Sequence, residues 1–212
     1  MKGLLITFEG TEGSGKSTQI QLLAERLRKI GRTVRVLREP GGTAIGEEIR
    51  HTLKHSLDNQ AMTAETELLL MNASRAQLVR EVVRPALGAG EIVLCDRYYD
   101  STIAYQGYGR GLELKMVRQV VEVAVGETRP DLTIVFLVPM ALSQKRRQAR
   151  QARTPALRDR IEEAGTHFFE KVAEGYEAII ANEPQRVRQL DGKATVQEIS
   201  QKVWGMVEPL LS

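Results

Sequence analysis

The chain has 212 residues, of which 42% are hydrophobic and 27% charged, a composition typical of one folded globular domain and not of a disordered protein. The longest apolar run has nine residues and contains Pro139, whereas a membrane span needs roughly 20 residues. The net charge of +3 is local, because seven basic residues and one acid lie between Lys145 and Arg160. We therefore expect one cytoplasmic domain, residues 1–212, that binds neither nucleic acid nor membrane.

The N-terminal part of the chain predicts two strands and three helices. Residues 4–8 form a short apolar run, and apolar side chains recur at helical spacing over residues 17–30, until Gly31. A strand at 34–37 precedes the tight loop predicted by "EPGGT". Helices are expected at 44–55 and 64–83, the second ending before Pro85 because proline cannot donate a helical hydrogen bond.

The rest of the chain continues to alternate strands and helices. Strands are predicted at 92–95, 132–138 and 187–190, a short helix and a loop at 98–111, and helices at 116–125, 141–153 and 196–211. Pro155 interrupts the basic helix, and a long helix follows whose apolar stripe runs from Ile161 through Ala164 to Ile179. This alternation predicts a three-layer α/β/α fold with a five-stranded parallel sheet.

Residues 10–17 match the pattern Gly-x4-Gly-Lys-Ser, between a predicted strand and a predicted helix. The glycines let backbone N–H groups point inward at phosphate, and the helix adds its positive dipole end. Lys16 supplies a cation for the outer phosphates and Ser17 a hydroxyl for Mg²⁺. We expect the donor ATP to be bound by Gly10, Thr11, Glu12, Gly13, Ser14, Gly15, Lys16, Ser17 and Thr18.

The phosphate loop is shared by several classes of protein. The sequence lacks the Asn-Lys-x-Asp string by which GTPases recognise guanine, and the chain is short for a motor ATPase. A small kinase is the remaining class, and it needs a second anion site for its acceptor.

Two arginines predict that second site. Arg38 follows the second strand and Arg97 the third, so in a parallel sheet both reach the edge that carries the phosphate loop. The alternative is that each merely pairs with a neighbour, Glu39 or Asp96. Asp96 also stands where Mg²⁺ and its waters need a carboxylate.

The segments "REPGGT" (38–43) and "DRYYDSTIAYQG" (96–107), together with the phosphate loop, resemble bacterial thymidylate kinases in content, order and spacing. The resemblance covers essentially the whole chain and is weakest after about Glu163. It implies transfer of the γ-phosphoryl group of ATP to dTMP, giving dTDP and ADP for dTTP synthesis, with Mg²⁺ as cofactor, and a homodimer. The implied substrate site consists of Glu12, Arg38, Pro40, Arg50, Met71, Arg75, Arg97, Thr102, Tyr105 and Gln106.

Within that implied site, Arg38 and Arg97 bind the phosphate of dTMP, and Arg50 assists them. Tyr105 fills the space of a ribose 2′-hydroxyl, which favours deoxynucleotides. Glu12 meets the sugar 3′-hydroxyl or the metal shell.

The base pocket implied by the resemblance contains one departure from the family. Arg75 hydrogen-bonds the thymine edge, and Thr102 and Gln106 line the pocket. Met71 stands where the family usually has a phenylalanine that stacks on the base. Methionine can cover an aromatic face with its polarizable sulfur, although selectivity could differ. The alternatives are that Met71 and Tyr105 are plain core residues and that Arg75 is a solvated helix residue.

Arg146, Arg150 and Arg153 are spaced four and three apart, so they share one face of the predicted basic helix. Such a face is often merely solvated. The phosphate loop has no arginine of its own, and mobile arginines can stabilise the charge of a moving phosphoryl group and exclude water. The resemblance implies a lid at about 141–160, with Arg150 or Arg153 on that group.

The stretch after Pro155 resembles the family's lid-closing segment. There Asp159 and Glu162 are implied to meet the metal shell or the sugar, and an ion pair with Arg158 or Arg160 is the alternative.

Catalysis is expected to rest on positioning and charge neutralisation by Lys16, Asp96, Arg97 and a lid arginine, because the attacking group is already a phosphate oxyanion. The expected metal site comprises Ser17, Asp96 and Glu162. Two other functions stay open: a kinase for dUMP, thymidine or another acceptor, and a non-catalytic module that binds nucleotide or nucleic acid.

Overall fold

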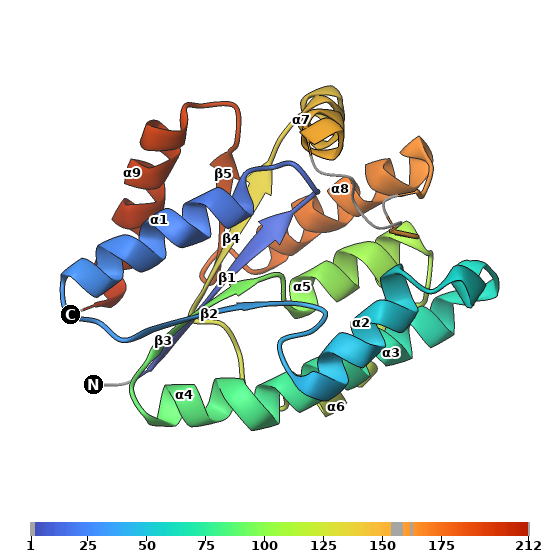
Figure 1. The fold of residues 1–212 in the computed structure, drawn as a ribbon, viewed down its shortest axis with the longest axis horizontal. Coiled ribbons are helices and arrows are strands. Elements are labelled where there is room, and N and C mark those ends of the chain that lie inside the picture. The colour runs from blue at the N-terminus through green and yellow to red at the C-terminus, as the bar shows by residue number, and fades with distance from the viewer. Residues whose placement is uncertain (1–2, 154–158, 162, 212) are drawn as a thin grey trace.

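The structure is a computed structural model that describes residues 3–153, 159–161 and 163–211, with the backbone alone at 147, 148 and 150–153. Its centre is a five-stranded parallel sheet in the order β2-β3-β1-β4-β5 (Figure 1). The strands are β1 (Leu4–Gly10), β2 (Val34–Arg38), β3 (Ile92–Asp96), β4 (Leu132–Leu137) and β5 (Val187–Asp191). The predicted fold class and all five strands are confirmed.

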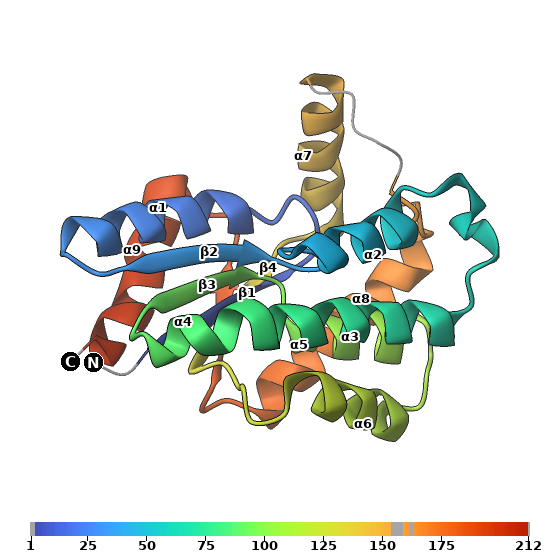
Figure 2. The same cartoon turned by 60° about the horizontal axis from the view of Figure 1, so that its bottom comes forward.

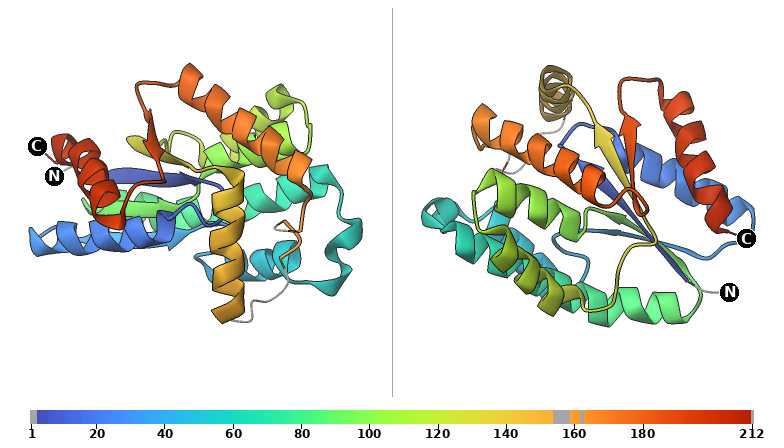
Figure 3. Two further views of the ribbon diagram at one scale, coloured as in Figure 1. Left: turned by 90° about the horizontal axis from the view of Figure 1, so that it is seen from above. Right: turned by 180° about the vertical axis from the view of Figure 1, so that it is seen from behind.

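Helices cover both faces of this sheet. The α-helices are α1 (Lys16–Lys29), α2 (Ala44–Lys54), α3 (Ala64–Leu78), α4 (Arg84–Gly88), α5 (Tyr99–Thr102), α6 (Leu114–Val125), α7 (Met140–Arg153), α8 (Thr166–Asn182) and α9 (Val196–Val207). Helices α1 and α9 cover one face of the sheet, and α3, α6 and α8 cover the other (Figure 3). A hydrophobic cluster fills the space between each group of helices and the sheet. In the described part of the chain, no helix combines the length and the apolar character needed to cross a bilayer.

The parallel register brings the carboxyl ends of the central strands to one edge. Phe8 of β1 and Arg38 of β2 both lie opposite Asp96 of β3, and β1 continues to Gly10 beside β4. Since β1, β3 and β4 are buried almost throughout, this edge is where the inner strands present charged residues. The expected meeting of the phosphate loop with the two strand-end arginines follows from this register.

The predicted stop before Pro85 is wrong. After α3 the helix continues through a π-helical segment, η2 (Val79–Val83), into α4, which ends at Gly88. The Arg84 N–H donates to the carbonyl of Val79, five residues back, so the hydrogen-bond register changes at this point. Pro85 therefore lies in the first turn of a new α-helical segment, where a missing N–H is tolerated.

Residues 98–111 are more helical than predicted. The loop expected after α5 is a second π-helical segment, η3 (Ile103–Gly109), which packs closely against α8. A Cβ on Gly109 would lie 2.7 Å from the Phe168 ring, and one on Gly175 would lie 3.0 Å from Cα of Ala104. Glycines that suggested a loop in the sequence thus permit close helix packing.

The apolar stripe predicted for the long helix begins too early, because α8 starts only at Thr166. Ile161 precedes the helix but is still buried, in a turn where its N–H donates to Asp159 Oδ1 at 3.0 Å. Apolar spacing alone does not distinguish such a buried turn from a first helical turn. At the other end of the chain, α9 gives way at Glu208 to a 3₁₀ turn, η4 (Glu208–Leu210), which contains Pro209. A further 3₁₀ turn, η1 (Leu57–Ala61), lies between α2 and α3.

Candidate active site

The phosphate loop joins β1 to α1, and its glycines have the conformations that a tight anion cradle requires. Gly10, Gly13 and Gly15 have φ angles of 125°, 77° and 102°. A Cβ on Gly13 would lie 2.7 Å from the carbonyl oxygen of Ser143, so α7 approaches too closely for any side chain there. Space and backbone conformation both exclude other residues at this position.

Lys16 crosses the mouth of the loop. It is 5% exposed, and its Nζ donates to the carbonyl oxygens of Gly10 at 3.0 Å and Thr11 at 3.1 Å. Burial, followed by the positive charge of Arg97, lowers the pKa of Lys16 to about 8. An ammonium group that is hydrogen-bonded to neutral oxygens and lies over the loop can transfer these bonds to charged phosphate oxygens, which are stronger acceptors.

Ser17 and Asp96 come together although 79 residues separate them in the chain. The Ser17 hydroxyl donates to Asp96 Oδ2 at 2.9 Å. Hydroxyl and carboxylate oxygens are ligands that suit Mg²⁺, so this pair fits the predicted metal site. No cluster of three or more His, Cys, Asp or Glu side chains suited to a metal occurs among the described residues, and Glu162 lies outside them.

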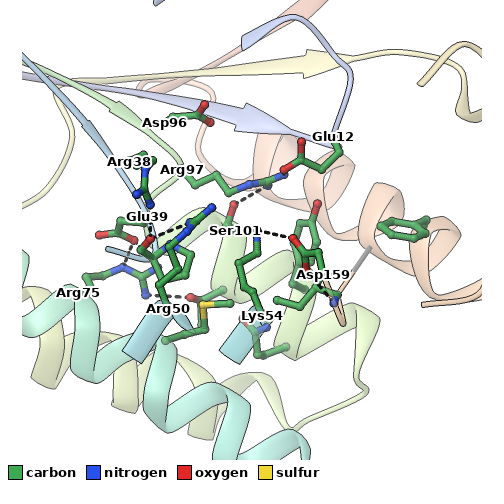
Figure 4. A pocket seen from close by; sticks show the side chains of 17 residues that line it. Glu12, Arg38, Glu39, Arg50, Lys54, Arg75, Asp96, Arg97, Ser101 and Asp159 are labelled. Carbon is green, nitrogen blue, oxygen red and sulfur yellow. Dashed lines mark hydrogen bonds and ion pairs between the residues drawn. The ribbon is translucent and has the colours of Figure 1, made fainter. Parts of the chain in front are cut away.

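A cavity opens beside the phosphate loop at the same sheet edge (Figure 4). Its lining contains all ten residues that the sequence predicted for the acceptor, namely Glu12, Arg38, Pro40, Arg50, Met71, Arg75, Arg97, Thr102, Tyr105 and Gln106. The structure therefore brings these residues together, and the role of each stays a prediction.

Arg38, Arg50 and Arg97 give one end of this cavity a positive charge (Figure 4). Arg38 donates to Glu47 Oε2 at 2.9 Å and, like Arg50, to the carbonyl oxygen of Pro40. Burial and the charge of Arg38 lower the pKa of Arg50. Arg38 is therefore not paired with its neighbour Glu39, and two mutually repelling guanidinium groups favour an anion between them.

Arg97 links the cavity to the phosphate loop. It has a left-handed backbone, with φ at 71°, and its N–H donates to the carbonyl oxygen of Phe8 at 2.9 Å. Its Nη2 lies 3.5 Å from Glu12 Oε1, and its Nη1 donates to Ser101 Oγ at 3.1 Å. The left-handed turn directs this side chain away from its sequence neighbour and toward the donor loop.

Glu9 is a buried acid of the site that the sequence reasoning missed. Its carboxylate accepts hydrogen bonds from the N–H of Tyr98 at 2.7 Å, the Ser101 hydroxyl at 2.5 Å and the Tyr176 hydroxyl at 2.9 Å. Burial, and then the negative charge of Asp100, raises the pKa of Glu9 to about 7. The available signal was an acid within the otherwise apolar first strand. Since the Ser101 hydroxyl also accepts a hydrogen bond from Arg97, Glu9 helps to hold the Arg97 side chain in position through Ser101.

Arg75 forms a fixed wall of the cavity beside Glu39 (Figure 4). It is only 2% exposed, which rules out the alternative of a solvated helix residue. Its Nε donates to Glu39 at 2.7 Å, and its Nη1 donates to Asn72 and to Thr102, each at 2.8 Å. These bonds hold the guanidinium group rigidly behind the space predicted for the base.

Two of the residues that line the cavity, Tyr105 and Glu39, each have a buried side-chain oxygen without a partner in the described part of the chain. The Tyr105 hydroxyl and Glu39 Oε1 have no hydrogen-bond partner among the described residues. The Tyr105 ring lies 5.0 Å beneath the Arg97 guanidinium group and contacts Phe168 edge-on. Unpartnered buried polar atoms around one cavity are expected where a ligand supplies the missing partners.

The basic helix α7 stands away from the body of the molecule (Figure 2). Its first turns hold the phosphate loop, since the Ser143 hydroxyl donates to the carbonyl oxygen of Glu12 at 2.5 Å. Arg146 donates to the carbonyl oxygen of Gly192, in the turn after β5, at 3.2 Å. The side chains of Arg150 and Arg153 lie outside the described part of the structure.

Residues 159–161 lie at one side of the cavity. Asp159 lines the cavity and pairs with Lys54 of α2 at 2.6 Å, while Arg160 pairs with Glu67 of α3. Nothing in the sequence indicated that Lys54 would be the partner of Asp159, because the two residues are 105 positions apart. These pairs attach residues 159–161 to α2 and α3.

A parallel sheet in this strand order, with a phosphate loop after its central strand and a separate cationic cavity at the same edge, defines a P-loop nucleotide kinase fold. The family model for thymidylate kinases matches residues 8–203. The chain belongs to the thymidylate kinase family, as the resemblance of its motifs predicted.

Similar proteins cover nearly the entire chain. The thymidylate kinase of Syntrophotalea carbinolica is 46% identical over 200 residues, which are 94% of this chain and 92% of the relative. That of Ectopseudomonas mendocina is 44% identical over 211 residues, 100% of this chain and 98% of the relative. The crystal structure of thymidylate kinase from Ehrlichia chaffeensis matches with a TM-score of 0.78 and 30% identity, over 98% of this chain and 99% of that one.

Proposed function

We propose that the chain transfers the γ-phosphoryl group of ATP to dTMP and releases dTDP and ADP. The observation that carries this proposal is the cavity beside the phosphate loop: Arg38, Arg50 and Arg97 supply positive charge, and Arg75, neutralised by its ion pair with Glu39, forms a rigid wall with Thr102. A nucleoside monophosphate matches both parts, because its phosphate is anionic and its base is neutral. Membership of the thymidylate kinase family supports dTMP as that acceptor.

The donor site is assigned to the loop at residues 10–18. Lys16 would pass its hydrogen bonds from the carbonyl oxygens of Gly10 and Thr11 to the outer phosphates of ATP. Ser17 and Asp96 would hold Mg²⁺. When bound, this ion supplies positive charge to the phosphate oxygens.

The acceptor phosphate is assigned to Arg38, Arg50 and Arg97. Arg97 contacts Glu12 of the donor loop and lies in the wall of the acceptor cavity, so it can stabilise charge on both sides of the transferred group. The attacking phosphate oxygen is already ionised, and for this reason no side-chain base is required. Tyr105 would contact the deoxyribose, and Arg75, Thr102, Gln106 and Met71 the base.

Release of ADP measured with dTMP, dUMP, CMP and thymidine tests this assignment. We expect dTMP to be the preferred acceptor and thymidine to be poor, because thymidine leaves the cationic end of the cavity unfilled. A preference for thymidine would contradict the roles given to Arg38 and Arg97. ATP binding without ADP release, together with salt-sensitive binding to oligonucleotides, would instead support the non-catalytic module.

We further propose that residues 1–212 form one kinase domain with a lid at about 141–160. In this proposal Arg150 or Arg153 closes on the transferred phosphoryl group, and Glu162 joins the metal shell. Truncating each arginine in turn should identify the one whose loss lowers kcat with little change in the KM for dTMP.

A cytoplasmic homodimer is part of the same proposal. Leu69 of α3 and Val123 of α6 are 57% and 76% exposed, and an interface would cover such apolar side chains. Light scattering of the wild-type chain and of Leu69→Asp tests this. A wild-type chain that remains a monomer would contradict it.

A further inference from the structure

Glu67 lies behind the predicted base pocket and is fully buried in α3. Its carboxylate accepts a hydrogen bond from Gln106 Nε2 at 2.7 Å and two from Arg110, at 2.9 and 3.1 Å. Arg160, in the segment that follows α7, also donates to it. Two guanidinium groups therefore oppose this acid, and they keep an ionised carboxylate in place although it is buried.

This arrangement fixes the orientation of the Gln106 amide. An ionised carboxylate can only accept hydrogen bonds, so the NH₂ end of the amide must face Glu67. The carbonyl oxygen Oε1 is then directed away from Glu67. No described residue donates a hydrogen bond to Oε1. This oxygen is also not one of the fully buried side-chain atoms that lack a partner, so part of its surface is accessible. Since Gln106 lines the acceptor cavity, Oε1 is an acceptor available to a ligand there.

The orientation of one amide matters because pyrimidines differ at the corresponding atoms. Thymine and uracil carry an N–H donor at N3 between two carbonyl groups. Cytosine has a bare nitrogen acceptor at N3 beside an amino group. An oxygen that the pocket directs at N3 accepts a hydrogen bond from thymine or uracil but repels the lone pair on N3 of cytosine. A site whose polar groups are left unpaired by a ligand binds that ligand much more weakly.

We propose that Glu67 determines base specificity by holding the Gln106 amide so that its oxygen faces N3 of the acceptor base. The inference rests on the proposed function and extends it to a residue outside the cavity lining. Glu67 acts through Gln106 and is thus a positioning residue. It selects pyrimidines that carry an N3–H and disfavours cytosine.

The substitution Glu67→Gln tests the proposal directly. Glu67 Oε2 accepts from both Arg110 and Arg160, whereas Oε1 accepts from Gln106 and, at 3.1 Å, from Arg110 Nε. The oxygen of the new amide would therefore stay with the two arginines at the Oε2 position, and its NH₂ group would displace the longer Arg110 bond and face Gln106. Gln106 would then rotate, presenting NH₂ to the cavity. We expect the KM for dTMP to rise and the ratio of kcat/KM for dTMP over dCMP to fall by about tenfold or more, the loss expected for one buried hydrogen bond.

The matched control is Glu65→Gln, an exposed acid two residues earlier in the same helix. It makes the same charge change and should leave the ratio as in the wild-type chain. A ratio that is also unchanged in Glu67→Gln would overturn the inference.

A second variant covers the case in which Glu67→Gln does not fold. Gln106→Met removes the amide but leaves Glu67 with Arg110 and Arg160. It should lower the same ratio because kcat/KM falls for dTMP and stays unchanged for dCMP. An unchanged ratio in Gln106→Met would also overturn the inference. Failure of the wild-type chain to phosphorylate dTMP would instead contradict the proposed function.

Discussion

The buried acid Glu9 makes the stability of this protein depend on pH, and the substitution Glu9→Gln should remove that dependence. The amide has nearly the same shape as the carboxyl group. Its oxygen can keep the N–H donors of Tyr98 and Ser101, which both bond Oε1, and its NH₂ group can donate to the hydroxyl oxygens of Ser101 and Tyr176. The substitution thus preserves the hydrogen-bond network and removes only the charge.

The size of the effect follows from the pKa of Glu9. Burial, then Asp100, raises this pKa from its ordinary value of 4.5 to about 7. Below pH 4.5 both the folded and the unfolded chain carry the proton, so the group adds no pH dependence. Between pH 4.5 and 7 the unfolded chain loses the proton while the folded chain retains it, and stability falls. At about 1.4 kcal/mol per pH unit, the total loss is about 3 kcal/mol.

The assay is urea unfolding of the wild-type chain and of Glu9→Gln at several values from pH 4.5 to 8. The free energy of unfolding of the variant minus that of the wild-type chain should rise with pH and level off above pH 7. Taking this difference cancels the contributions that other titrating groups make to the pH dependence. Glu39 is one of them, because burial raises its pKa as well. Lys16, with a pKa of about 8, acts mainly above this range. A difference that stays constant within about 0.5 kcal/mol would refute the reasoning.

Three further predictions concern the donor site and the packing behind it. Lys16→Met should reduce kcat by at least about a hundredfold while dTMP binding, measured by calorimetry, stays nearly intact; equal loss of both would contradict the division of roles. Ser17→Ala should raise the Mg²⁺ concentration for half-maximal ADP release, and an unchanged Mg²⁺ titration would exclude Ser17 from the metal site. Asp100→Asn removes the buried charge to which Arg186 donates at 2.7 and 2.9 Å in the wild-type chain, and among the described residues leaves this arginine only the more exposed Glu183 as an ionic partner. It should reduce the free energy of unfolding by about 3 kcal/mol in urea titrations, and a loss near zero would show that the pair is not needed.

Local patterns in the sequence were sufficient for the fold class, the phosphate loop and the strand-end charges of the site, whereas Glu9 was missed. A phosphate loop depends on glycines, Lys16 and Ser17 within a few residues of one another, so its chemistry is visible in a short window. The strand ends at Arg38 and Asp96 could be predicted because parallel strands present their carboxyl ends at one edge. All ten residues that the resemblance to thymidylate kinases implied for the acceptor line one cavity.

Backbone details were less accessible, because more than one structure satisfies the same local signal. Pro85 stops an ordinary α-helix, but a π-helical turn before it lets the helix continue. Glycines at 107 and 109 suggested a loop, yet they lie in η3, where Gly109 allows close contact with α8. At Pro85 a local change of hydrogen-bond register decided the outcome, and at η3 it was packing against α8.

The sequence by itself determined what kinds of groups this protein has at its site: a phosphate loop, strand-end arginines, an acid for a metal and a basic helix. Only the tertiary structure decided which charges meet. Arg38 pairs with Glu47 and Arg75 with Glu39, while the buried Glu67 joins Gln106 to Arg160. The reason is physical: a charged side chain interacts with whatever lies within a few ångströms in space, and folding sets those distances independently of separation along the chain.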